Sequence, residues 1–191
     1  MRLFIGVSIP GFALKEIIKI QEMLRPGLGS SIRWTNPTSL HLTLKFIGET
    51  TEHKRADIVK VIQDASKGFS GFSIDCIGLG VFPNRRLPKV IWLGFELKQE
   101  LLKLQNEIDN NLVIVGFGKE KQGFSPHLTI GRVNSQLASG ESMFLNEKMD
   151  EFSGKVITTF PITEINLIKS DLKQSGPLYT IQNTIPLKPF D

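Results

Sequence analysis

The chain of 191 residues has one cysteine, three histidines and no apolar run long enough to cross a membrane. A single cysteine, Cys76, excludes an internal disulfide and any metal site built from several cysteines. Because Cys76 lies in the apolar stretch FSIDCIGLGVF, we expect a buried, unreactive thiol. A membrane helix needs about 20 apolar residues, and the apolar N-terminal stretch, which ends at Pro10, is too short for a signal peptide. The sequence therefore predicts a soluble, cytoplasmic protein that does not bind membranes.

The sequence also lacks low-complexity segments and any run of like charges that would form a tail. Its 40% hydrophobic and 22% charged residues are typical of globular domains, and the length is sufficient to bury a core. The net charge of +4 and the pI near 9.2 are compatible with a phosphate or nucleic-acid ligand but do not identify one. Nothing in the composition indicates an obligate protein partner.

Alternating and helical spacings of apolar residues predict an α+β fold. Strands are expected at residues 2–9, 31–35, 39–46, 71–82, 89–95, 127–132, 155–160, 163–172 and 178–187, and helices at 12–25, 52–66, 98–112 and 141–152. Pro26 is expected to end the first of these helices, and Thr51 to cap the second. Because the order of elements partly recurs, we expect bilobal, pseudo-symmetric antiparallel β-sheets with helices packed outside and a central cleft. The whole chain, 1–191, is expected to form one domain of two intertwined lobes.

Two of the three histidines stand in the same frame, His-Leu-Thr-aliphatic, within SLHLTLKFIGE and SPHLTIGRV. In a strand, alternate side chains share a face, and the first motif alternates strictly. Four apolar side chains are expected to point into the core: Leu40, Leu42, Leu44 and Phe46. Four polar side chains are expected on the opposite face: Ser39, His41, Thr43 and Lys45. A single outward histidine is usually a surface residue, but the repetition of the motif favours a functional site.

The strand of the second motif is expected to begin at His127, because Pro126 cannot donate a hydrogen bond to a sheet. His127 and Thr129 then share a face that points away from the core. Arg132 has the opposite parity unless the strand contains a bulge. Gly131 favours such a bulge, and we expect it to turn the guanidinium toward the histidine and threonine.

Two histidines that face one ligand are suited to general acid–base catalysis, because the pKa of a free histidine lies near neutrality. Threonine hydroxyls on the same face can donate hydrogen bonds to charge that develops on phosphate oxygens. In-line displacement at phosphorus needs a base and an acid on opposite sides, and two similar lobes provide that arrangement. By symmetry alone, His41 and His127 are interchangeable as acid and base.

Zinc catalysis is the main chemical alternative, but a zinc site uses three or more protein ligands and the motifs supply two histidines. The third histidine, His53, lies between Glu52 and Lys54 in the first turn of an expected helix. We expect His53 to be exposed and unrelated to the motifs. The sequence therefore predicts no metal and no cofactor.

The paired motifs resemble the HxTx motifs of the 2H phosphoesterase superfamily. Longer stretches are similar to the prokaryotic RNA 2′,3′-cyclic phosphodiesterases, long called 2′-5′ RNA ligases: RLFIGVSIP, IRWTNPTSLHLTLKFIGE, FPNRRLPKVIWLGF, FSPHLTIGRV and SDLKQSGPLYT. The similarity extends from Arg2 to about Leu187. The resemblance implies a single bilobal 2H phosphoesterase domain that hydrolyses a terminal RNA 2′,3′-cyclic phosphate to a 2′-phosphomonoester without a metal.

The resemblance also implies roles for the motif residues. His41 would be the proton donor to the leaving 3′ oxygen, and His127 the proton acceptor that activates water. Thr43 and Thr129 would bind the phosphate. The implied partners are RNA ends or oligonucleotides with a 2′,3′-cyclic phosphate. The same transfer in reverse, with an RNA hydroxyl in place of water, would join RNA ends through a 2′-5′ linkage.

Several other residues have both a functional and a structural interpretation. Arg132 is expected either to contact substrate phosphate or to form a structural ion pair, and Lys45 to support the phosphate from the face of His41. Arg85 and Arg86, in the FPNRRLPK loop, are candidates to follow an RNA backbone. Three aromatic residues are candidates to stack on a base or simply to pack: Trp34, Phe124 and Tyr179.

Two other functions stay open at this point. The same motifs would serve a 2H phosphodiesterase that acts on another cyclic or 2′-5′-linked nucleotide. A non-catalytic RNA-binding module is the alternative of another class. Binding alone needs arginine and lysine but not two histidines, so the repeated motif favours an enzyme.

Overall fold

The computed structural model of the chain describes residues 1–119, 123–173 and 176–190. The elements, in order, are β1 (Arg2–Ser8), α1 (Gly11–Leu28), η1 (Gly29–Ser31), β2 (Ile32–Trp34), η2 (Pro37–Ser39), β3 (His41–Glu49), α2 (Glu52–Ser66), β4 (Phe72–Phe82), β5 (Val90–Phe95), α3 (Gln99–Ile114), β6 (His127–Val133), α4 (Ser139–Glu151), β7 (Val156–Ile162), β8 (Glu164–Lys173) and β9 (Gly176–Pro186). Each helix and strand expected from the spacing of apolar residues is present, with ends that differ by a few residues.

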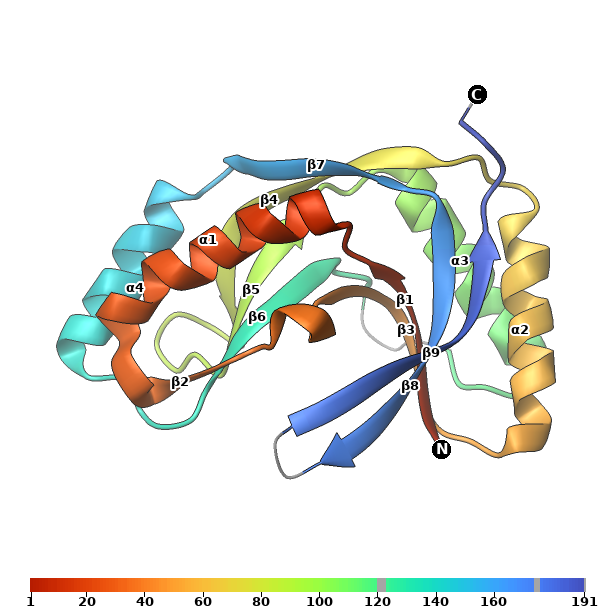
Figure 1. Cartoon of the computed structure of the whole chain (residues 1–191), viewed down its shortest axis with the longest axis horizontal. Coiled ribbons are helices and arrows are strands. Elements are labelled where there is room, and N and C mark those ends of the chain that lie inside the picture. The colour runs from red at the N-terminus through yellow and green to blue at the C-terminus, as the bar shows by residue number, and fades with distance from the viewer. Residues whose placement is uncertain (120–122, 174–175, 191) are drawn as a thin grey trace.

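Two antiparallel sheets form the centre of the molecule (Figure 1). One has the strand order β3-β1-β8-β9, and the other has the order β2-β6-β5-β4-β7. Helices α2 and α3 lie outside the first sheet, and α1 and α4 lie outside the second. The expected α+β fold, with antiparallel sheets inside and helices outside, is therefore confirmed. Within the described residues, no helix is both long enough and apolar enough to span a bilayer.

The two halves of the chain exchange elements between the sheets. Strand β4 lies in the first half of the chain but pairs with β7 of the second half, and β8 lies in the second half but pairs with β1. Helix α1 follows β1 yet packs against β7 of the other sheet, and α3 follows β5 yet packs against β3. As a result, β3 and β6, which carry the two motifs, meet where the sheets come together.

The core lies between each sheet and its helices. Inward side chains of the strands, such as Leu42 and Leu128, are fully buried, as are Ile17 and Leu104 on the apolar faces of α1 and α3. Cys76 is also fully buried, and burial raises the pKa of its thiol to about 12. The thiol is therefore the unreactive core group expected from the sequence.

Two local expectations about helix ends are wrong. Helix α1 does not stop at Pro26 but continues to Leu28. Because Pro26 lies in the last turn, it removes only one hydrogen bond near the end of the helix, and the chain turns at Gly29, where φ is 50°. Thr51 occupies the position before α2, but its side chain makes no capping hydrogen bond.

Candidate active site

A cleft of about 340 Å³ lies between the two sheets and contains both motifs. Its lining comes from strands of both sheets and the segment before the first motif: Arg33, Trp34, Thr35, Asn36, Ser39, His41, Thr43, Phe46, Phe82, Val90, His127, Thr129, Arg132, Pro177 and Tyr179. Among the described residues that line the cleft, none is acidic. The cleft is therefore suited to an anionic ligand.

A β-bulge shapes the strand of the first motif. Thr43 lies opposite Gly6 of β1, but Lys45 lies opposite Ile5, so Leu44 is an extra residue. The bulge reverses the alternation of side chains beyond it. Phe46 therefore lines the cleft with His41 and Thr43, and Lys45 turns to the core side. The expected orientations of both Phe46 and Lys45 were wrong, because they assumed unbroken alternation.

Lys45 is held on the core side by a buried ion pair. Its Nζ lies 2.6 Å from Oδ1 of Asp109 in α3, and both side chains are about 5% exposed. Nζ also donates a hydrogen bond to the backbone oxygen of Gly118, at 2.9 Å. A group placed in this way cannot reach a ligand in the cleft. Lys45 therefore does not share the cleft face of His41, and its ammonium group is bound on the core side of the strand.

The same bulge is present in the strand of the second motif. Thr129 lies opposite Trp92 and Gly131 opposite Ile91, so Ile130 is the extra residue. The expected bulge is therefore present, and Arg132 lines the cleft. A Cβ at position 131 would lie 2.7 Å from Cγ2 of Ile32, which explains why a glycine occupies this position.

The backbone holds the two histidine rings in the same way. Nδ1 of His41 lies 2.8 Å from the carbonyl oxygen of Ser39, and Nδ1 of His127 lies 2.8 Å from that of Ser125. A carbonyl oxygen can only accept, so each Nδ1 carries the proton of the neutral ring. Nε2 of each ring is then left to exchange a proton with a ligand. Backbone contacts of this kind fix the tautomer and the orientation of functional histidines.

The surroundings of His41 affect its charge. Its ring centroid lies 4.5 Å from that of Phe4 and 4.9 Å from that of Tyr179. Burial holds the pKa of His41 below its ordinary value of 6.5; the hydrogen bond to Ser39 opposes this shift, and the nearby His127 adds to it. At neutral pH, His41 is therefore mainly neutral. The ring of His127 packs edge-on against Phe82, with centroids 5.0 Å apart.

Two arginines supply the positive charge of the cleft. Arg33 of β2 and Arg132 of β6 are direct partners across the two strands, and both line the cleft. In the part of the chain that the structure describes, neither has an acidic side chain within ion-pair distance. The alternative interpretation of Arg132 as a structural ion pair is therefore not supported.

The remaining candidate residues lie in different places. Trp34 lines the cleft beneath the guanidinium of Arg25, which lies 5.2 Å from its ring centroid. Tyr179 of β9 also lines the cleft, and burial raises the pKa of its hydroxyl despite the opposing charge of Arg132. Phe124 packs against the core and is not part of the lining. Both aromatic residues in the cleft therefore stay candidates for base stacking.

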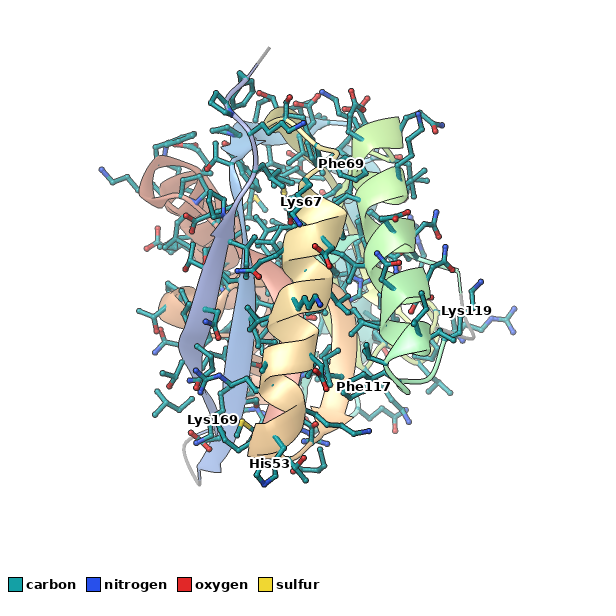
Figure 2. All side chains as sticks on the ribbon, turned by 90° about the vertical axis from the view of Figure 1, so that its right-hand side faces the viewer. His53, Lys67, Phe69, Phe117, Lys119 and Lys169 are labelled. Atoms are coloured by element: carbon teal, nitrogen blue, oxygen red, sulfur yellow. The ribbon has the colours of Figure 1, made fainter. Side chains whose placement is uncertain are left out.

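The arginines of the β4–β5 loop do not line the cleft. Nη1 of Arg85 lies 2.8 Å from Oδ1 of Asp150 in α4, and Arg86 is exposed in the same loop. His53 is exposed in the first turn of α2, on the outer face formed by α2 and α3 (Figure 2). Within the described residues, no three histidine, cysteine, aspartate or glutamate side chains gather closely enough to hold a metal ion.

Several residues of the cleft were not singled out from the sequence as parts of the site, among them Arg33, Phe46 and Phe82. Phe46 was assigned to the core because the bulge at Leu44 has no local marker. Arg33 lies in a short strand, and its position depends on the pairing of that strand with β6. Sequence spacing alone contains no signal for such a pairing.

Comparison with known proteins gives one consistent family. The family model described as LigT like Phosphoesterase matches residues 7–92 and 95–179. A protein of Methanothermobacter thermautotrophicus named RNA 2′,3′-cyclic phosphodiesterase is 33% identical over 180 residues, which cover 94% of this chain and 95% of the relative. A protein of Thermotoga maritima with the same name is 32% identical over 187 residues, which cover 95% of this chain and 92% of the relative.

The fold is also known from solved structures. The protein TT0787 of Thermus thermophilus superposes with a TM-score of 0.82 at 24% identity, covering 99% of both chains. The family model covers both motifs, and the relatives cover nearly the whole chain. On this evidence the chain, with its paired HxTx strands around one cleft, belongs to the LigT-like 2H phosphoesterases.

Proposed function

We propose that the protein is an RNA 2′,3′-cyclic phosphodiesterase that forms a 2′-phosphomonoester by paired-histidine catalysis. The observation that carries the proposal is the pair of histidines on equivalent bulged strands, each anchored through Nδ1 and facing one cleft. The cleft adds the motif threonines Thr43 and Thr129 and two arginines and, among the described lining residues, no carboxylate. The relatives named RNA 2′,3′-cyclic phosphodiesterase support the choice of substrate.

In the proposed reaction, the motif residues take the roles that the family resemblance implies. Nε2 of His127 accepts a proton from water, and the water oxygen bonds to phosphorus as the bond from phosphorus to the 3′ oxygen breaks. His41, protonated on Nε2, donates its proton to the leaving 3′ oxygen. Thr43 and Thr129 donate hydrogen bonds to the non-bridging oxygens, and the guanidinium of Arg132 balances their charge.

Binding of the substrate prepares His41 for its role as the acid. Burial between Phe4 and Tyr179 keeps the pKa of His41 low. A negatively charged cyclic phosphate favours the protonated ring, so it raises the proton affinity of His41 on binding. His41 therefore becomes protonated, and able to act as the acid, when the substrate binds.

The test is turnover of a short RNA with a 2′,3′-cyclic phosphate end, measured in excess EDTA. The wild type is expected to release a 2′-monophosphate with a bell-shaped pH profile. His41→Ala and His127→Ala are each expected to lose about 100-fold or more, as for a lost general acid or base. Thermal unfolding of each variant serves as the control for folding.

Each other outcome favours a different function. Loss of wild-type activity in EDTA would indicate a metal-dependent reaction. Turnover of another cyclic or 2′-5′-linked nucleotide, without turnover of the RNA end, would make the protein a 2H phosphodiesterase of different specificity. Tight RNA binding without any turnover, unchanged in both histidine variants, would indicate a binding module.

A further inference from the structure

The apolar face of helix α1 carries a buried polar side chain. Gln21 is 1% exposed and lies on the same face as Ile17, Ile20 and Leu24, which belong to the core. A buried side-chain amide costs stability unless it is hydrogen-bonded, so an apolar residue of similar size would be the ordinary choice at this position. Departures from such a local rule are expected mainly where a function requires them.

The amide of Gln21 donates two hydrogen bonds to backbone oxygens near the second motif. Nε2 lies 2.8 Å from the oxygen of Ile130 in β6 and 2.9 Å from that of Thr35, directly after β2. The backbone N–H of Thr35 donates to the same oxygen of Ile130, at 3.0 Å. Gln21 therefore joins the end of β2 and one residue of β6 to the helix on the outer side of their sheet (Figure 1).

Ile130 is the residue at which β6 departs from regular pairing. It is the extra residue of the bulge and has no partner in β5, so its carbonyl lies where the ladder is interrupted. The bulge brings Arg132 to the face of His127 and Thr129, whereas a regular strand would turn Arg132 away from them. The hydrogen bond from Gln21 thus supports the irregularity that directs Arg132 into the cleft.

A second buried glutamine occupies the equivalent place in the other half of the chain. Residues 17–21 of α1 read IIKIQ, and residues 101–105 of α3 read LLKLQ. Gln105, at the end of the second stretch, is 4% exposed. Helix α3 packs against β3, the strand of the first motif, as α1 reaches β6 through Gln21. The buried glutamine therefore repeats together with the motif.

We propose that Gln21 is a positioning residue that holds Arg132 toward the substrate phosphate through the bulge of β6. This inference rests on the proposed function, in which the guanidinium of Arg132 balances the charge on the non-bridging oxygens. Gln21 does not line the cleft, so it acts only through the backbone of Ile130. Without its hydrogen bonds, β6 gains freedom to straighten at the bulge, and Arg132 moves away from the phosphate.

The experiment compares KM for a short RNA with a 2′,3′-cyclic phosphate end in the wild type, Gln21→Met, Arg132→Gln and the double variant. Methionine is unbranched and about as long as glutamine, but it cannot donate a hydrogen bond. Because the phosphate is an anion before and during the reaction, Arg132→Gln is expected to raise KM about tenfold, the effect of one charge-assisted hydrogen bond. Gln21→Met is expected to raise KM by up to the same factor.

The choice of KM separates positioning from a general effect on folding. KM does not depend on the amount of folded enzyme, so a merely structural role of Gln21 would lower the apparent kcat and leave KM unchanged. The double variant is expected to have the KM of Arg132→Gln, since Gln21 then has no guanidinium to position. Combined with Thr43→Val, on the other motif strand, the effect of Gln21→Met is expected to multiply instead.

Two variants serve as controls. Ile20→Met changes the packing of the same face of α1 without removing a hydrogen bond. Gln63→Met makes the same substitution at an exposed glutamine of α2. Both are expected to keep the KM of the wild type.

Gln21→Glu gives a second test that needs no comparison of folded amounts. Its protonated carboxyl can donate one hydrogen bond to a backbone oxygen, but its carboxylate cannot donate. Burial raises the pKa of such a carboxyl, so the protonated form is present at the acidic end of the assay range. The KM of Gln21→Glu relative to that of the wild type is therefore expected to rise with pH, while the same ratio for Gln21→Met stays constant.

Some outcomes overturn this inference and leave the proposed function intact. If the wild type hydrolyses the RNA end and Gln21→Met keeps its KM, Gln21 does not position Arg132. The same holds if the effects of Gln21→Met and Arg132→Gln multiply in the double variant, or if the KM ratio of Gln21→Glu does not change with pH. Failure of the wild type to hydrolyse the RNA end would overturn the proposed function itself.

Discussion

Strands β3 and β6 have the same His-Leu-Thr frame and the same bulge one residue later, but they differ in the two residues that follow it. On the core side, Lys45 of β3 corresponds to Gly131 of β6. On the cleft side, Phe46 corresponds to Arg132. The backbone therefore repeats the arrangement of the histidine and the threonine, and the side chains after the bulge make the two copies different.

The core-side difference reflects what each strand packs against. Behind β3, Lys45 reaches Asp109 of α3. Behind β6, a side chain at Gly131 would collide with Ile32 of the neighbouring strand. On the cleft side, Phe46 and Arg132 are both exposed, so packing in the core constrains them less. The comparison teaches that adjacent residues of one strand meet different constraints, one from packing in the core and one from the cleft.

The largest effect on stability is expected from breaking the buried ion pair between Lys45 and Asp109 on the core side of β3. Lys45→Met keeps the length of the side chain, but the carboxylate of Asp109 loses a cation that lies 2.6 Å away. The free energy of unfolding is expected to fall by about 3 kcal/mol. Urea denaturation of the wild type and the variant measures this loss.

The double variant Lys45→Met with Asp109→Leu sharpens the same test. Apolar residues of similar size often replace a buried ion pair with little loss, so most of the stability is expected to return. A double variant as unstable as Lys45→Met would contradict this account. It would show that other contacts of Lys45 or Asp109, such as the hydrogen bond from Lys45 to the Gly118 carbonyl, matter more than the ion pair.

A smaller effect is expected on the core side of β6. Gly131→Ala places a Cβ 2.7 Å from Cγ2 of Ile32, and the free energy of unfolding is expected to fall by about 1–3 kcal/mol. Gly140→Ala is the matched control, because no atom lies within 4 Å of its added Cβ and alanine favours the helix. Thermal unfolding of both variants should therefore give shifts of opposite sign.

The smallest effect concerns the pH dependence of the two histidines. Tyr179→Ala uncovers His41, so the pKa of His41 is expected to rise toward its ordinary value. If His41 is the acid, it then stays protonated to higher pH, and the alkaline side of the kcat/KM profile extends upward. Tyr179→Phe keeps the ring and is expected to change the profile less.

The same profile tests the assignment of acid and base. If His41 were the base, a raised pKa would keep it protonated at low pH, and the acidic side of the profile would move upward instead. An unchanged profile in Tyr179→Ala would show that Tyr179 does not contribute to the burial that lowers the pKa of His41.

Much of the fold was predictable because periodic spacing of apolar residues is a local property. The orientation of side chains was predictable only where the sequence marks an irregularity. Gly131 pointed to the bulge that turns Arg132 into the cleft, but no glycine or proline marks the equivalent bulge at Leu44. The expected orientations of Lys45 and Phe46 were therefore wrong. Arg33 could not be placed in the site, since its neighbour Arg132 lies far along the chain.

The exchange of strands between the two sheets affects the order in which the sheets can form while the chain is being synthesised. When a ribosome has produced the chain only as far as the end of β4, that strand has neither of its neighbours, since β5 and β7 are still to come. Strand β1 likewise lacks β8 on one side. His41 of β3 is therefore synthesised early. Its sheet still lacks β8 until residues Glu164–Lys173 have left the ribosome. A half-made chain therefore has no assembled pair of motif histidines, because His127 lies in β6.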